Sequence, residues 1–196
     1  APVIVFACDT ALDACSVAIV RGVEKLASMT ESMNRGQAER LPLMAREAMQ
    51  AAGVAFADLD LIVVTVGPGS FTGVRVGLSF ARALAVALKR PVVGVSTLEA
   101  LALGAGEEGL LAALIETPAA SYFALYDNGA ASIPPGAIER GAHQTLIANR
   151  DVVLVGPGAV PDMVALASRA QRLDSALYPP NPLYLRHSGA TLPSGA

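Results

Sequence analysis

The sequence predicts an α/β fold built on a mixed β-sheet, and three observations support this prediction. In the first hundred residues, three short apolar runs precede a segment with helical periodicity, and a strand then returns after each helix. A glycine-rich turn joins one apolar run directly to a long segment rich in alanine and leucine. The chain of 196 residues is 53% hydrophobic and 16% charged, so it can bury a substantial core.

The first three predicted strands form an antiparallel meander. They are β-rich apolar runs at residues 3–8, 15–20 and 24–30. Turn signals separate them at residues 10–13 and at Arg21-Gly22.

A helix is predicted over residues 37–52, because apolar side chains recur there at three- and four-residue steps and Gly53 closes the segment. Pro42 should either mark the first turn of this helix or kink it, since proline in a helix interior costs about 3 kcal/mol. A strand at residues 61–66 follows, and it leads into the glycine-rich stretch 67–73.

The next helix, at residues 71–89, is apolar around most of its circumference, whereas an ordinary surface helix has one apolar stripe. Small residues recur in it every four positions, at Gly73, Gly77, Ala81 and Ala85. Such a row lets another helix approach closely, so we expect the sheet on one side and a second subunit on the other. The alternative is a helix buried within one chain.

The second half of the chain is less regular. After a strand at 91–95 and a helix at 97–103 capped by Ser96, we expect a lobe boundary that divides the chain into residues 1–104 and 105–196. Further strands are expected at 110–115, 122–126 and 152–155. Little periodicity is visible over 128–149, and the proline-rich tail from Tyr178 should be extended.

The glycine stretch invites a comparison with phosphate-binding loops. A P-loop requires Gly-Lys-Ser/Thr, but no lysine occurs between Lys25 and Lys89. A dinucleotide-binding fingerprint requires G-x-G-x-x-G, whereas the spacing of Gly67, Gly69 and Gly73 contains one residue more. A general anion cradle at the helix N-terminus remains an alternative. We favour a tight turn at the first two glycines and close packing at the third.

Composition argues against several functional classes. The net charge is −3 and no long basic run occurs, which disfavours autonomous RNA binding. The two histidines, His143 and His187, have no neighbouring ligand, and no H-x-x-x-H motif supports a metalloprotease. We expect no metal or cofactor, with His143 in a surface loop. Cys8 and Cys15 are expected to be reduced and buried.

Nucleophilic hydrolysis and membrane insertion are also disfavoured. Ser70 lacks a G-x-S-x-G elbow, and it is expected, with Thr72, to cap the long helix instead. Proline, glycine or a charge interrupts each apolar run before the roughly 20 residues that span a bilayer. The N-terminus has no cationic lead and reads as a strand, so we expect a cytoplasmic protein.

Together, these residues and motifs resemble those of the TsaB family of bacterial proteins. The resemblance is dense over about the first 103 residues and is most specific in GPGSFTGVRVGLSFARALAVAL, at residues 67–88. Residues 4–11, 15–18 and 92–100 also match, and residues 182–186 resemble the family's C-terminal P-x-Y-x-R element.

The resemblance implies an actin/Hsp70-like (ribonuclease H-like) fold of two lobes, with a five-stranded mixed sheet in the first. It also implies a non-catalytic scaffold in the complex that forms threonylcarbamoyladenosine in tRNA. Members pair with the catalytic subunit TsaD, are joined by the ATPase TsaE, form a homodimer when alone, and meet tRNA only through the complex. The chain is short for this family, so either the second lobe is reduced or flexible segments are missing from the sequence.

On this resemblance, the helices at 37–52 and 71–89 carry the interface with TsaD. The residues expected in it are Leu41, Met44, Ala48, Val74, Gly77, Leu78, Ala81 and Leu84. The family's basic Asp-Ala-Arg-Arg-like stretch is absent, since residues 116–122 read ETPAASY here.

The alternative function is an ATP-binding or ATP-hydrolysing member of the same superfamily. Its candidate nucleotide-binding residues lie in the first hairpin and the glycine stretch: Asp9, Thr10, Ser16, Gly67, Gly69 and Ser70. Such sites usually need several carboxylates to hold magnesium, and Asp9 and Asp13 are the only ones near the hairpin.

Overall fold

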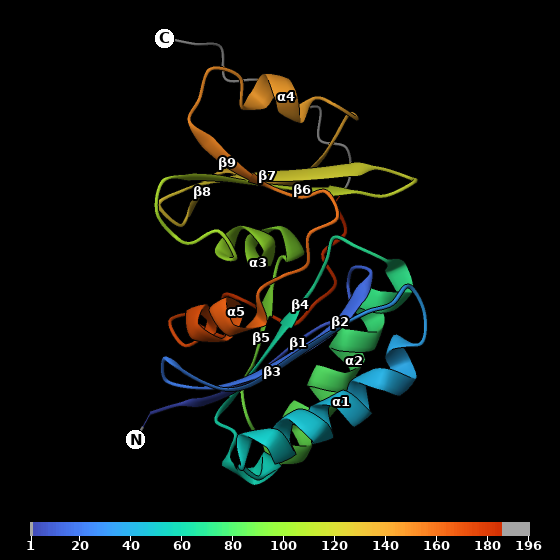
Figure 1. Ribbon diagram of the computed structural model, residues 1–196, viewed down its shortest axis with the longest axis vertical. Coiled ribbons are helices and arrows are strands. Elements are labelled where there is room, and N and C mark those ends of the chain that lie inside the picture. The colour runs from blue at the N-terminus through green and yellow to red at the C-terminus, as the bar shows by residue number, and fades with distance from the viewer. Residues whose placement is uncertain (1, 186–196) are drawn as a thin grey trace.

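The computed structural model describes residues 2–185 and consists of two mixed sheets with helices between them and on their outer sides (Figure 1). The predicted α/β class with a mixed five-stranded sheet is confirmed. In Figure 1, α1 and α2 lie on one side of the five-stranded sheet, α3 lies between the two sheets, and α4 lies beyond the four-stranded sheet.

The first sheet has strand order β3-β2-β1-β4-β5. Its strands are β1 (Ile4–Asp9), β2 (Ala14–Arg21), β3 (Glu24–Ser32), β4 (Leu61–Thr65) and β5 (Val92–Val95). The first three form the predicted antiparallel meander, whereas β4 and β5 are parallel to β1. The carboxyl ends of β1, β4 and β5 therefore meet at one edge of this sheet.

Two helices cover one face of this sheet, α1 (Gln37–Ala52) and α2 (Phe71–Leu88), and a short 3₁₀ turn η1 (Phe56–Asp58) follows α1. The predicted bounds of α1 match, and Gly53 ends it in the left-handed conformation, with φ of 68°. Pro42 lies inside the helix, in its second turn. The apolar side chains of both helices and of the strands below them form one core cluster.

The opposite face of the same sheet is covered by a helix from the second half of the chain, α5 (Met163–Ala170). Asp162 caps α5 by accepting hydrogen bonds from the amides of Val164 and Ala165, both at 3.0 Å. Leu166 and Ala167 pack with strand residues such as Val5 in a second core cluster. Residues beyond the expected boundary at 104 therefore complete the first sheet's core.

The second sheet has strand order β8-β7-β6-β9. It comprises β6 (Leu110–Glu116), β7 (Ser121–Asp127), β8 (Ala130–Ile138) and β9 (Val152–Val155), with α3 (Thr97–Leu103) on its inner face and the one-turn helix α4 (His143–Leu146) beyond it. The three strands predicted here are confirmed.

The region without visible periodicity, residues 128–149, contains two elements that were not predicted. Strand β8 has two prolines and a glycine, which hide its alternation, and it tolerates them because it is an edge strand. The expected surface-loop position of His143 was wrong, since it begins α4, is half-buried, and its Nδ1 is shielded from solvent.

The tail from Tyr178 to Leu185 forms neither helix nor strand, and it returns to the first sheet. The amide of Gly94 donates to the carbonyl of Tyr178 at 2.9 Å, and the amide of Leu183 donates to the carbonyl of Val66 at 2.8 Å. Two predicted features of the tail, Arg186 of the P-x-Y-x-R element and His187, lie outside the described residues.

Candidate functional site

The glycine stretch packs directly on the turn of the first hairpin. A Cβ atom on Gly69 would lie 2.2 Å from the carbonyl oxygen of Ala11, and one on Gly73 would lie 2.1 Å from that of Thr10. The two segments are also joined by hydrogen bonds, from the amide of Ser70 to Ala11 O at 2.7 Å and from Thr10 Oγ1 to Gly73 O at 2.6 Å. Close packing at Gly73 is confirmed.

Gly67 and Ser70 give this stretch its local shape. Gly67 has φ of +102°, a conformation that side-chain-bearing residues rarely adopt, and this agrees with the predicted turn. Ser70 is the N-cap of α2, because its Oγ accepts a hydrogen bond from the amide of Gly73 at 3.0 Å. The predicted capping role of Ser70 is confirmed, whereas Thr72 lies within the first turn of α2.

Asp9, at the end of β1, is fully buried in a polar pair with Thr65 of β4. Its Oδ1 accepts hydrogen bonds from the Thr65 hydroxyl and from the amide of Ala11. Its Oδ2 has no partner among the described residues, nor has the hydroxyl of Ser16, its neighbour on β2. Burial raises the pKa of the Asp9 carboxyl, and the two hydrogen bonds oppose this effect.

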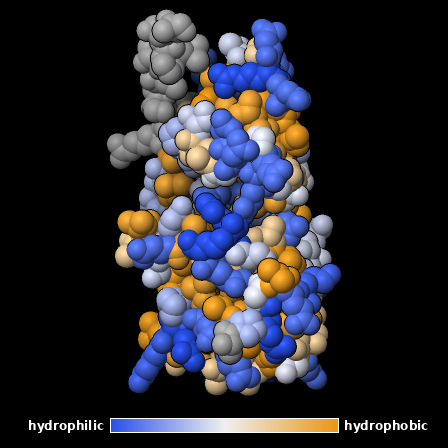
Figure 2. All heavy atoms as spheres, turned by 90° about the vertical axis from the view of Figure 1, so that its left-hand side faces the viewer, coloured by the Kyte–Doolittle hydropathy of each residue, from blue (hydrophilic) through white to orange (hydrophobic). Residues whose placement is uncertain are grey.

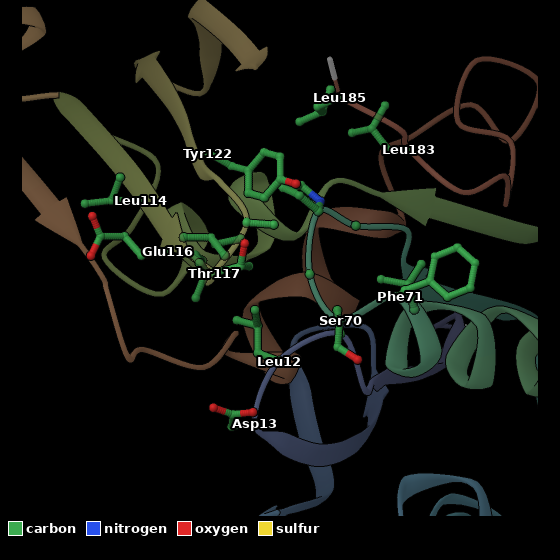
Figure 3. Close-up of a pocket in the computed structure, with 18 of the residues that line it drawn as sticks. Leu12, Asp13, Ser70, Phe71, Leu114, Glu116, Thr117, Tyr122, Leu183 and Leu185 are labelled. Carbon is green, nitrogen blue, oxygen red and sulfur yellow. The ribbon is translucent and has the colours of Figure 1, made fainter. Parts of the chain in front are cut away.

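A cleft of about 880 Å³ lies between the two sheets. Several parts of the chain converge on it, including the first hairpin turn, the start of α2, the region around the end of β6, residues 158–160 and the tail (Figure 3). The side chains labelled there are Leu12, Asp13, Ser70, Phe71, Leu114, Glu116, Thr117, Tyr122, Leu183 and Leu185. The labelled lining is thus mainly apolar, with Asp13 and Glu116 as its carboxylates.

The structure divides the six predicted nucleotide-binding residues into two sets. Gly67, Gly69 and Ser70 line the cleft, whereas Asp9, Thr10 and Ser16 are buried and do not line it. Nucleotide binding through these residues stays a prediction.

Potential metal ligands are scattered over the part of the chain that the structure describes. No group of three or more His, Cys, Asp or Glu side chains is close enough there to hold a metal ion. Cys8 and Cys15 are both free and buried, as predicted. Burial raises the pKa of both thiols, that of Cys15 to about 11, so neither is an activated nucleophile.

The eight residues expected to contact a partner mostly face the chain's own core. Seven of them are buried, and only Leu84 is half-exposed. The row of small residues on α2 faces the sheet: a Cβ on Gly77 would lie 2.9 Å from Thr10 Oγ1 and 3.4 Å from a methyl group of Val64. In the chain by itself the buried seven are Leu41, Met44, Ala48, Val74, Gly77, Leu78 and Ala81, and their contact with a partner stays a prediction.

Other apolar residues of α1 and α2 point outward. Leu43 is 45% exposed, Phe71 62% and Val86 79%. Between the two helices lies a groove of about 500 Å³. It is lined by Ala38, Leu41, Pro42, Phe71, Thr72, Arg75, Val76, Ser79 and Phe80. We call the groove together with Leu43 and Val86 the α1–α2 face.

The sequence contained a signal for the α1–α2 face, namely that α2 is apolar on more than one side. That signal did not tell which side the sheet would cover. Among the described residues, α2 is also the one helix long and apolar enough to cross a membrane, with a mean hydropathy of 1.4 over 18 residues. Core helices of soluble proteins pass the same test, and one side of α2 packs on the first sheet.

The side of α5, at the left of Figure 1, has a different character. Figure 2 shows that hydrophilic and hydrophobic residues are interspersed over it, with strongly hydrophilic residues across its middle. Such a mixture is ordinary for a solvated protein surface.

Comparison with known proteins places these features in a family. The family model described as "TsaD: tRNA N6-adenosine threonylcarbamoyltransferase" matches residues 26–123. The protein "tRNA threonylcarbamoyladenosine biosynthesis protein TsaB" of Escherichia coli K12 is 36% identical over 126 residues, covering 62% of this chain and 54% of the relative. The protein of the same name from Haemophilus influenzae is 39% identical over 101 residues, covering 52% and 42%. The chain thus spans about half the length of the curated relatives it matches.

Structural similarity extends over nearly the whole chain. The solved structure "YeaZ from Pseudomonas aeruginosa" superimposes with a TM-score of 0.77 at 27% sequence identity, covering 93% of this chain and 100% of that one. This superposition agrees with the two-sheet architecture. This chain therefore belongs to the TsaB/YeaZ family, whose members have an actin/Hsp70-like fold and are paralogues of TsaD.

Proposed function

We propose that this chain is the non-catalytic subunit of the complex that forms threonylcarbamoyladenosine in tRNA, and that it pairs with TsaD through the α1–α2 face. The names of its relatives indicate the pathway. The observation that carries the pairing is the outward apolar surface of α1 and α2, where Phe71 and Val86 are more than half exposed and Phe71 lines the groove. Large apolar side chains exposed beside a groove are typical of protein interfaces.

Two features support a role without catalysis. The turn of the first hairpin touches the glycine stretch directly, which fills the space where the two loops would otherwise hold a phosphate. The carboxyl of Asp9 lies beneath that contact with no exposed atoms, so it cannot reach a ligand in the cleft without movement of the hairpin. On this proposal TsaE joins the TsaD-bound form, tRNA meets the chain only through the complex, and the protein works in the cytoplasm.

Size-exclusion chromatography with light scattering tests the pairing, with the protein alone and mixed with TsaD. We expect a one-to-one complex, and a shift of any homodimer toward it. Val86→Glu places a charge in the apolar face and should weaken the complex at least tenfold, because burying an unpaired carboxylate is costly. Val153→Glu is the matched control, since Val153 is 55% exposed on β9 of the other sheet.

A biosynthetic readout completes the test. Bacteria depleted of their own TsaB should regain threonylcarbamoyladenosine in tRNA, measured by mass spectrometry, when the wild-type chain is supplied, and less of it with Val86→Glu. The proposal fails if wild-type protein and TsaD elute separately at micromolar concentrations, or if Val153→Glu is as damaging as Val86→Glu.

The cleft between the two sheets supports a second candidate function, namely that the chain is a subunit that binds ATP. Its volume of about 880 Å³ falls in the range of small-molecule sites, and it lies between the sheets beside Gly67 and Ser70. Calorimetric titration with magnesium-ATP distinguishes the two functions. Saturable binding that Glu116→Gln or Ser70→Ala weakens would support the nucleotide role.

A further inference from the structure

The outer side of α2 carries cations without compensating acids. Residues 70–90 contain Arg75, Arg82, Lys89 and Arg90 and no aspartate or glutamate, although the whole chain has a net charge of −3. The first three are seven residues apart, which places them along one edge of the helix. All four are exposed.

Several arginines elsewhere in the described residues have carboxylate partners. Arg40, for example, pairs with both Glu31 and Glu47, and Arg172 pairs with Glu107. The ion pairs among residues 2–185 include none of the four cations in or just after α2. We call Arg75, Arg82, Lys89 and Arg90 the cationic edge.

Neighbouring groups fix the position of the cationic edge at the rim of the α1–α2 face. Arg82 Nη2 donates to Asn181 Oδ1 of the tail at 3.0 Å, and Arg75 Nη2 lies 3.4 Å from the Tyr184 hydroxyl. The guanidinium of Arg75 also stacks over the Phe71 ring at 3.7 Å. Arg75 and Arg82 therefore lie between the tail and the outward apolar side chains of α2, whereas Arg90, at the other end of the edge, donates to the carbonyl of Ala57 at 3.5 Å.

A second copy of this chain is a poor match for that rim. A twofold-symmetric contact brings the same patch of each subunit together, so the two cationic edges would approach each other. Helix α1 does not compensate, since its Glu39 and Glu47 are balanced by Arg40 and Arg46. Like charges at an interface rim slow association and select against the wrong partner.

We propose that the cationic edge selects, at the α1–α2 face, a protein partner whose apolar helical surface is flanked by carboxylates, in preference to a second copy of this chain. This inference rests on the proposed function and specifies the chemistry of the partner at the same surface. It predicts that TsaD presents acidic side chains opposite α2.

The test compares association rates of wild-type protein and the Arg82→Glu/Lys89→Glu double variant with immobilised TsaD. Wild-type association should be at least about tenfold faster at about 0.1 M than at about 1 M salt, since the Debye length falls from about 10 to about 3 Å over that range. The double variant should be slow at both concentrations. Arg82→Lys retains the charge and should behave as wild type.

The control is Lys25→Glu/Arg150→Glu, which makes the same change in net charge at exposed residues outside α1 and α2. It should leave the rate within about twofold of wild type, and thermal melting shows whether each variant is folded. A parallel light-scattering series should show that self-association of wild type strengthens as salt rises, because screening removes the repulsion.

Each contrary outcome has a definite meaning. TsaD binding that is indifferent to salt and to the double variant overturns this inference and leaves the proposed function intact, whereas no wild-type binding overturns both. Unmodified tRNA or phosphatidylglycerol vesicles serve as further probes of the cationic edge. Binding of either one to the isolated protein, abolished by Arg82→Glu/Lys89→Glu while TsaD association is unchanged, would assign the edge to phosphate groups instead and overturn the inference.

Discussion

Gly73 and Gly77 lie one turn apart on α2 and face the same hairpin, yet the structure gives them different tolerances. A Cβ on Gly73 would lie 2.1 Å from the backbone oxygen of Thr10, which cannot move without shifting the hairpin. The atoms nearest to a Cβ on Gly77 would belong to side chains, Thr10 Oγ1 at 2.9 Å and a methyl group of Val64 at 3.4 Å. The nature of the nearest atom, rather than burial, separates these two glycines.

We therefore expect Gly73→Ala to lower the free energy of unfolding by about 3 kcal/mol or more, at the upper end of what overpacking costs. For Gly77→Ala the loss should be about 1 kcal/mol or less, since alanine gains about 1 kcal/mol of helix propensity over glycine. Urea denaturation followed by circular dichroism measures both. Equal losses for the two variants would show that the hairpin does not constrain the glycine stretch as described.

From the buried carboxyl of Asp9 we expect a contribution to the free energy of unfolding that decreases as pH rises, the reverse of the usual carboxylate effect. Its pKa is raised in the folded protein above the model value of 3.8, so the folded state binds the proton more tightly than the unfolded state. Its contribution to stability is fully present below about pH 3.8 and is lost as pH rises through the folded pKa. Glu31 and Glu47 act in the opposite direction, because hydrogen bonds from Arg40 lower their pKa values.

The contribution of Asp9 is isolated by comparing wild type with Asp9→Asn at each pH, because the other carboxylates are common to both. We expect the stability of wild type relative to the variant to decrease as pH rises. The decrease should be about 1.4 kcal/mol per pH unit between the unfolded-state and folded-state pKa values, where the carboxyl is ionised in the unfolded state and protonated in the folded state. Chemical denaturation from pH 3 to pH 8 provides the measurement. A relative stability that increases with pH would mean that Asp9 is ionised in the fold.

At the scale of elements, the sequence was sufficient wherever local pattern and tertiary packing agree. The glycine that ends α1, the serine that caps α2 and the alternation from apolar strand to helix predicted most of the first sheet and its helices. Strand β8 was missed because its prolines and glycine are permitted only by its edge position, which no local window reveals.

The same limit applies at the candidate site. An all-round apolar helix such as α2 shows that two sides need cover, but only the packed fold shows that Gly77 and Ala81 face the sheet and Val86 faces outward. The cations of the edge can be read from the sequence. That the ion pairs of the described residues include none of them comes from the tertiary structure.

At the scale of the whole molecule, the order of segments along the chain does not match the order of layers in space. Helix α5 and the tail follow the second sheet in sequence but pack on the first. The first sheet's α5 face includes Val5, Ala7 and Val63, all fully buried with Met163, Leu166 and Ala167 around them. A division at residue 104 would remove this cover.

We therefore expect residues 1–104, expressed alone, not to form a stable domain, although they contain the whole five-stranded sheet with α1, α2 and α3. Each large aliphatic side chain left uncovered forfeits about 1.5–3 kcal/mol of burial energy, and a typical domain has a net stability of only 5–15 kcal/mol. The isolated fragment should show poorly dispersed amide resonances and no cooperative thermal transition. Adding residues 105–196 in trans should restore both, because α5 and the tail then supply the missing layer. A fragment 1–104 that unfolds cooperatively by itself would show that α1 and α2 alone stabilise the sheet, and that α5 docks on a preformed surface.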